Sequence, residues 1–119
     1  MKKILVVDDV AENRDIFTTC LEGQYEVLEA ADGAQGLALA EAEIPDLIFL
    51  DVSMPGMSGF EVINAMRKHH LLYRVPVIAV TAHSVVSARR AVEKGCNDFL
   101  LKPVTSLKIQ EKIDEWLIA

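Results

Sequence analysis

Residues 47–51 read Leu47-Ile48-Phe49-Leu50-Asp51, four consecutive apolar residues that end directly in an acid. Continuous rather than alternating hydrophobicity indicates a strand that is buried on both faces, as in parallel sheets covered by helices. Similar apolar runs recur along the chain. We interpret them as further strands, at Ile4–Val7, Val75–Val80, Phe99–Leu101 and, with a weaker pattern, Tyr25–Leu28.

The segments between these runs carry apolar residues at helical spacing. Gly23 and Gly95 stand where the end of a helix favours a left-handed residue, and Ser58 can cap the helix that follows it. Strand and helix units that alternate in this way are joined by right-handed crossovers. The sequence therefore predicts an α/β fold, a doubly wound five-stranded parallel sheet of order 2-1-3-4-5 with five helices.

Length and charge exclude several classes of protein. A chain of 119 residues has room for one domain, and its net charge of −6 repels the phosphate backbone, so we expect no nucleic-acid partner. Cys20 and Cys96 have no CxxC spacing, which argues against a disulfide framework or a zinc site. Because the apolar runs are too short for a signal peptide or a membrane span, we expect a cytoplasmic protein with no membrane partner.

Polar residues directly follow the predicted strands, apart from the second strand, which contributes nothing comparable. They are Asp8-Asp9 after the first, Asp51 after the third, Thr81 after the fourth and Lys102-Pro103 after the fifth. In doubly wound sheets, ligands bind at the carboxyl ends of the strands where the strand order reverses. We therefore expect these side chains to share one crevice.

Three carboxylates in one crevice repel one another unless protons or a cation neutralise them, and ligands that offer only oxygen select a hard ion such as Mg²⁺. Mg²⁺ is thus the predicted cofactor. A Mg²⁺ site beside the hydroxyl of Thr81 and the ammonium of Lys102 suits a phosphoryl group. The predicted reaction class is phosphoryl transfer.

Four motifs lie in order at these strand ends: Leu5–Asp9, Asp51 with Met54–Gly59, Val80–Ala82 and Phe99–Pro103. With them the chain resembles the receiver domains of bacterial two-component response regulators over almost its whole length. The resemblance implies a flavodoxin-like receiver fold for residues 1–119, of the single-domain type, with no output domain.

The resemblance also implies the roles of individual acids. Asp51 would be the phosphoacceptor, which attacks the phosphorus of a phosphohistidine to give an acyl phosphate. Asp8, Asp9 and Asp51 would hold Mg²⁺ together with the backbone carbonyl of Ser53. Such a protein catalyses its own phosphorylation and dephosphorylation and is not an enzyme of multiple turnover.

Lys102 and Thr81 would each bind a phosphoryl oxygen, and a cis Lys102-Pro103 bond would aim the ammonium into the crevice. Phe99 would be the switch aromatic, which moves inward as Thr81 is drawn to the phosphate. This movement would repack the face formed by the fourth helix, the fifth strand and the fifth helix, which we expect to bind the downstream protein.

Two further positions, Ser53 and His83, occupy places where the family varies and where side chains tune dephosphorylation. The expected phosphoryl donor is a histidine kinase or a histidine phosphotransfer protein, and the chain is expected to be a monomer or a phosphorylation-dependent dimer. For His69-His70 we expect solvation at a helix end, without an acidic partner.

Other functions remain open. The chain can be a receiver domain excised from a hybrid histidine kinase, or a degenerate receiver that binds partners without phosphorylation. An aspartate-nucleophile Mg²⁺-dependent phosphatase would carry a second acid where this chain has Ser53. A flavodoxin-like cofactor binder would place Gly, Ser and Thr after the first strand, where Asp8-Asp9 would repel a phosphate.

Overall fold

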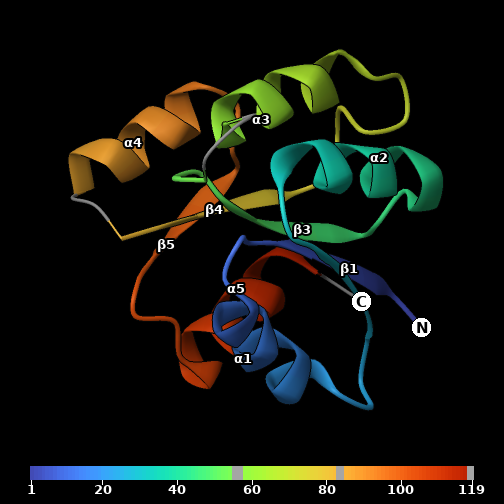
Figure 1. The fold of residues 1–119 in the computed structure, drawn as a ribbon, viewed down its shortest axis with the longest axis vertical. Helices are drawn as coiled ribbons and strands as arrows, with labels where there is room; N and C mark the ends of the chain where they lie inside the picture. Colours follow the sequence, from blue (N-terminus) through green and yellow to red (C-terminus); the bar gives the residue numbers. More distant parts are fainter. Residues whose placement is uncertain (55–57, 83–84, 118–119) are drawn as a thin grey trace.

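In the computed structural model, the described residues 1–54, 58–82 and 85–117 contain one sheet of five parallel strands (Figure 1). The strand order is β2-β1-β3-β4-β5, as predicted. The strands are β1 (Lys3–Val7), β2 (Glu26–Ala30), β3 (Leu47–Asp51), β4 (Val77–Thr81) and β5 (Asp98–Leu101). Side chains are not described for residues 85–88.

The helices alternate with the strands and cover both faces of the sheet. They are α1 (Ala11–Leu21), α2 (Gly33–Glu43), α3 (Gly59–Lys68), α4 (Val85–Glu93) and α5 (Ser106–Trp116). Figure 1 shows α1 and α5 on one face and α2, α3 and α4 on the other. This is the predicted doubly wound architecture.

Burial explains why some strands have a stronger sequence pattern than others. Every residue of β3 and β4 is buried, since both strands have neighbours on each side and helices on each face. Along β1, Leu5 and Val7 join the core under α2 and α3, whereas Ile4 and Val6 join the core under α1 and α5. The edge strand β2 is only partly buried, and its apolar run is correspondingly the weakest.

Several strand ends differ from the prediction by one or two residues, and two strands begin later than predicted. β2 begins at Glu26 rather than Tyr25, because the Tyr25 N–H donates to the Leu21 carbonyl and completes the end of α1. β4 begins at Val77 rather than Val75, because the Val75 N–H donates back to Leu72 in a turn. Both predicted strands thus included residues of the preceding turn.

The predicted helix ends are confirmed. The hydroxyl of Ser58 accepts a hydrogen bond from the Glu61 N–H and caps α3. Gly23 and Gly95 have φ angles of 81° and 119°, in the region that favours glycine. At the start of α3, a Cβ on Gly59 would lie 2.5 Å from the Cα of Val52, so only glycine allows this helix to approach the end of β3 so closely.

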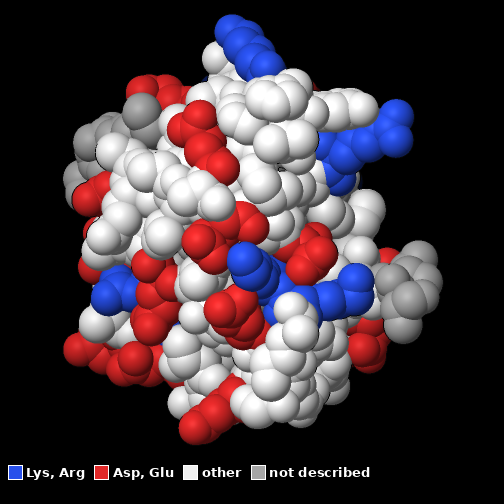
Figure 2. All heavy atoms as spheres, turned by 90° about the vertical axis from the view of Figure 1, so that its right-hand side faces the viewer, with Lys and Arg blue, Asp and Glu red and all other residues white. Residues whose placement is uncertain are grey.

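The surface reflects the excess of acidic residues. Figure 2 shows acidic side chains over much of the side on which the N-terminus lies, with fewer basic groups among them. Among the described residues, no helix is long and apolar enough to cross a membrane.

Candidate functional site

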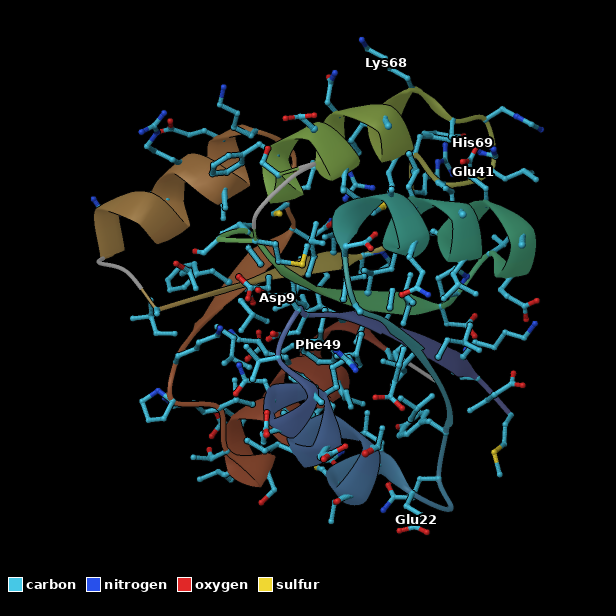
Figure 3. The ribbon with its side chains drawn as sticks, viewed as in Figure 1. Asp9, Glu22, Glu41, Phe49, Lys68 and His69 are labelled. Atoms are coloured by element: carbon cyan, nitrogen blue, oxygen red, sulfur yellow. The ribbon has the colours of Figure 1, made fainter. Side chains whose placement is uncertain are left out.

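The carboxyl ends of β1 and β3 bring together three acids that are far apart in the sequence. Carboxylate oxygens of Asp8, Asp9 and Asp51 all lie within 4.8 Å of one another. Asp8 and Asp51 are buried, whereas Asp9 is exposed. Figure 3 shows Asp9 beside the end of β1, where the chain leaves the sheet toward α1. The structure thus forms the predicted acidic cluster.

Each buried acid uses one carboxylate oxygen to hold its own loop. Asp8 Oδ1 accepts a hydrogen bond from the Val10 N–H at 2.9 Å, and Asp51 Oδ1 accepts one from the Ser53 N–H at 2.8 Å. These bonds stabilise the turns that follow β1 and β3. The second oxygen of each acid, Oδ2, faces Lys102.

Lys102 follows β5 and reaches both buried acids. Its Nζ lies 3.2 Å from Asp51 Oδ2 and 3.7 Å from Asp8 Oδ2. The Lys102-Pro103 peptide bond is cis, and the Lys102 N–H donates to the Thr81 carbonyl at 2.8 Å. The side chain that was expected to bind a phosphoryl oxygen therefore already faces the acidic cluster.

The pKa of Asp8 is raised by burial and by repulsion from the other acids. Burial of the Asp8 carboxyl raises its pKa, and the charges of Asp51 and Asp9 raise it further, against the opposing effects of the Val10 N–H and Lys102. The cluster of three carboxylates has one neighbouring ammonium, which faces two of them, so negative charge is in excess. Because the acids offer only oxygen ligands, the donor set fits Mg²⁺.

The other residues named from the sequence lie around this cluster. Thr81 ends β4 and is fully buried. Phe99 lies on β5, partly buried against the core cluster that includes residues of α3. The Ser53 side chain is exposed, and His83 lies outside the described residues. Thr81, Lys102 and the acids therefore stand at the same edge of the sheet, with Phe99 inside β5.

Sequence reasoning missed the contribution of the second strand. The guanidinium of Arg14 in α1 donates to the Asp8 carbonyl at 2.7 Å and to Glu29 Oε1 of β2 at 3.2 Å. The Asp8 N–H donates to the Ala30 carbonyl, also in β2. Thus β2 supports the acidic loop although it adds no side chain to the cluster.

Asp98 was missed as well. Its carboxylate accepts hydrogen bonds from Lys112 Nζ at 2.8 Å and from Trp116 Nε1 at 3.0 Å, and it also accepts one from the Phe99 N–H. Burial of the Asp98 carboxyl would raise its pKa, but these hydrogen bonds outweigh that effect and lower the pKa. Asp98 thereby joins the start of β5 to the last turns of α5.

The expectation for His69 was wrong in one respect. His69 Nε2 lies 3.6 Å from Glu41 Oε2, so the histidine has an acidic neighbour, contributed by α2 (Figure 3). His69 Nδ1 accepts a hydrogen bond from the Leu71 N–H. The sequence could not show this pair, because packing of two helices brings the residues together.

Comparison with known proteins finds relatives of one family. A family model described as the response regulator receiver domain matches residues 4–114. The polar-differentiation response regulator DivK of Brucella ovis is 31% identical over 118 residues, which cover 98% of this chain and 96% of DivK. The response regulator PleD of Caulobacter vibrioides is 37% identical over 113 residues, which cover 93% of this chain but only 25% of PleD.

Solved structures agree with the fold. The chemotaxis protein CheY4 of Vibrio cholerae superposes with a TM-score of 0.90 at 30% identity, covering 98% of both chains. The receiver domain of the sensor histidine kinase PA1611 of Pseudomonas aeruginosa has a TM-score of 0.89 at 30% identity, covering 98% of this chain and 97% of that one. That structure contains a magnesium ion in its active-site cleft. The chain described here belongs to the response regulator receiver domains of two-component signalling.

Proposed function

We propose that this receiver accepts a phosphoryl group on Asp51 in a Mg²⁺-dependent reaction and passes the signal to a protein partner. One observation carries the proposal. The Asp51 carboxylate lies with those of Asp8 and Asp9 within 4.8 Å, and its Oδ2 is 3.2 Å from the Lys102 ammonium. Three carboxylates and one ammonium thus lie close together at one edge of the sheet, which supports a nucleophile, a cation site and a phosphoryl-binding group there.

We assign the nucleophile to Asp51 Oδ2, because this oxygen faces the Lys102 ammonium that would bind the phosphoryl group, whereas Oδ1 is turned toward the Ser53 N–H. This oxygen attacks the phosphorus of a phosphohistidine, the P–N bond breaks, and the imidazole leaves as the new P–O bond forms. Asp8, Asp9, Asp51 and the Ser53 carbonyl would hold Mg²⁺, which neutralises charge on the phosphoryl oxygens when bound. The donor is a histidine kinase or a histidine phosphotransfer protein.

After transfer, Lys102 binds one phosphoryl oxygen and the Thr81 hydroxyl binds another. Phe99 then turns into the space that Thr81 leaves, and the face formed by α4, β5 and α5 changes shape. The hydrogen bonds from Lys112 and Trp116 to Asp98 support this route, because they tie α5 to the residue next to Phe99. We propose that this face binds the downstream protein or, on phosphorylation, a second copy of the chain.

The lifetime of the acyl phosphate depends on how water reaches it. Ser53 is small and exposed beside Asp51, so we propose that it leaves room for an attacking water or for a side chain of a phosphatase. His83 is proposed to tune the same step.

The proposal is tested by the intact mass of the protein after incubation with Mg²⁺ and acetyl phosphate. The wild type is expected to gain one phosphoryl group, and both the Asp51→Asn variant and an EDTA control are expected to gain none. Equal uptake by Asp51→Asn would assign the phosphoryl group to another residue and would exclude this mechanism. If the acyl phosphate is too short-lived to weigh, a beryllofluoride titration followed by amide chemical shifts tests the same site. Repeated turnover of a phosphate ester would instead identify a phosphatase.

A further inference from the structure

The backbone of Asp8 is held on both sides by β2, directly and through Arg14. The Asp8 N–H donates to the Ala30 carbonyl at 3.1 Å. The Asp8 carbonyl accepts from Arg14 Nη1 at 2.7 Å, and Arg14 Nε donates to Glu29 Oε1 at 3.2 Å. The neighbouring residues Glu29 and Ala30 thus anchor the two backbone groups of Asp8.

The carbonyl that Arg14 holds belongs to the same peptide unit as the N–H of Asp9. Because a peptide unit is planar, a hydrogen bond that fixes the direction of its carbonyl also fixes the direction of the bond from its nitrogen to the Cα of the next residue, here Asp9. Asp9 is the exposed member of the acidic cluster. The buried carboxylates of Asp8 and Asp51 are also held by the side chains packed around them. The exposed carboxylate of Asp9 depends more on the direction of its backbone.

Arginine is suited to this place for a geometric reason. The Arg14 side chain is only 18% exposed, and it satisfies two acceptors in different directions with two nitrogens of one rigid plane. A lysine ammonium would carry the same charge but lacks the planar fork. The contact therefore depends on the shape of the side chain as well as on its charge.

We infer that Arg14 is a positioning residue of the cation site, which orients the Asp8-Asp9 peptide so that the Asp9 carboxylate joins those of Asp8 and Asp51. The inference rests on the proposed function, because the acids are the proposed Mg²⁺ ligands. Residues that orient metal ligands typically change metal affinity by about 10- to 100-fold when they are replaced.

Electrostatics alone predicts the opposite sign. Arg14 is positively charged and lies beside an acidic cluster, so removing its charge should strengthen cation binding if charge were its only effect. A purely structural role predicts a third result, lower stability with unchanged Mg²⁺ affinity. The direction of the change in affinity therefore separates the three explanations.

The experiment measures the Mg²⁺ dissociation constant of the full chain by calorimetry for wild type, Arg14→Met, Arg14→Lys and Arg74→Met. Arg74→Met is the matched control, since Arg74 is exposed before β4, where it stacks on Tyr73 at the amino edge of the sheet. Arg14→Met is expected to weaken binding about 10-fold, Arg14→Lys less, and Arg74→Met not at all. The free energy of unfolding in EDTA is measured for each variant.

Equal or tighter Mg²⁺ binding by Arg14→Met would overturn the inference and leave the proposed function intact. If Arg14→Met does not fold, Arg14→Lys decides by the same criterion. If the wild type itself binds no Mg²⁺, the proposed function fails, and the amide signal of Asp9 in the metal-free protein tests the positioning by itself. That signal is expected to shift in the Arg14 variants and not in Arg74→Met, and an unshifted signal would refute the inference.

Discussion

The ammonium of Lys102 lies 3.2 Å from the carboxylate of Asp51. Lys102 follows β5 and Asp51 ends β3, so β4 lies between the two strands that carry this pair. The same ammonium is 3.7 Å from Asp8, so one cation serves two buried acids. In the absence of metal, Lys102 is therefore the main partner that compensates these acids among the described residues. We therefore expect the stability of the fold to depend on whether a cation, either the Lys102 ammonium or a bound metal ion, lies beside these carboxylates.

We expect Lys102→Met to lower the free energy of unfolding by about 3 kcal/mol in EDTA, because it leaves buried carboxylates without their cation. Saturating Mg²⁺ is expected to restore most of this loss. Urea denaturation with and without Mg²⁺ measures both effects. The control is Lys68→Met, since Lys68 is exposed and points away from the fold in Figure 3. A Lys102→Met protein as stable in EDTA as the control would contradict the expected role of the ammonium.

We expect Asp8→Asn to have the opposite effect on the metal-free protein. The raised pKa of Asp8 means that its ionised form opposes folding above that pKa, and this cost disappears as the pH falls through it. The variant should thus have a higher melting temperature than wild type at neutral pH in EDTA, and the two should converge in acid. A melting temperature that falls at neutral pH would refute this sign.

The same variant should lose the stabilisation that Mg²⁺ confers. For the wild type, Mg²⁺ at about 100 times its dissociation constant is expected to add about 2.7 kcal/mol to the free energy of unfolding, since the ion binds only the folded state. Thermal melts at increasing Mg²⁺ measure the gain. Asp114→Asn, at an exposed position of α5, serves as the matched control and should keep the full gain.

We expect Asp98→Asn to cost about 1–2 kcal/mol, because it weakens charge-assisted hydrogen bonds from Lys112 and Trp116. The lowered pKa of Asp98 gives the sign of the pH dependence. Its contribution is complete above the pKa of the unfolded chain and is lost as the pH falls through the folded pKa. The difference between wild type and variant should therefore vanish in acid. Trp116 fluorescence should change in the variant at neutral pH, and an unchanged spectrum would argue against the indole contact.

We expect Gly59→Ala to lower the free energy of unfolding by about 1–3 kcal/mol, because the added methyl group would lie 2.5 Å from Val52 Cα and 3.0 Å from the Asp51 carbonyl oxygen. Either α3 or the end of β3 must move. Denaturation and Mg²⁺ titration of the variant measure the cost and its effect on the site. Asn64→Ala, on the exposed side of the same helix, should leave both quantities near their wild-type values.

The sheet and the acidic cluster could be predicted because burial leaves a direct pattern in the sequence. β3 and β4 are covered on both faces, so their residues are almost all apolar, and the strand ends identify Asp51 and Thr81 without any knowledge of tertiary contacts. β2 lies at the edge of the sheet and is only partly buried, and its boundaries were predicted less well. Parallel topology then brings Asp8 and Asp51 together, because β1 and β3 are adjacent.

Contacts between side chains of different elements could not be predicted in this way. Arg67 shows why, since its guanidinium donates to the carbonyls of Gly95, Leu72 and Val75 and to the side chain of Asn97. Nothing in the local sequence distinguishes this half-buried arginine from a solvated one at the end of α3. Its acceptors are backbone carbonyls and one side-chain amide from two loops, and only the folded packing brings them to Arg67. The same reason applies to Arg14 with Glu29.

The adjacency of β1 and β3 also has a consequence for folding kinetics. β2, α1 and α2 lie between these strands along the chain, so the acids meet only after a long loop has closed. Isolated helices and single strand–helix units contain no acidic cluster, and they experience neither its repulsion nor its affinity for a cation. An ion bound by Asp8, Asp9 and Asp51 would therefore stabilise the completed sheet. We expect the ion to slow the unfolding reaction and to leave the rate of folding nearly unchanged.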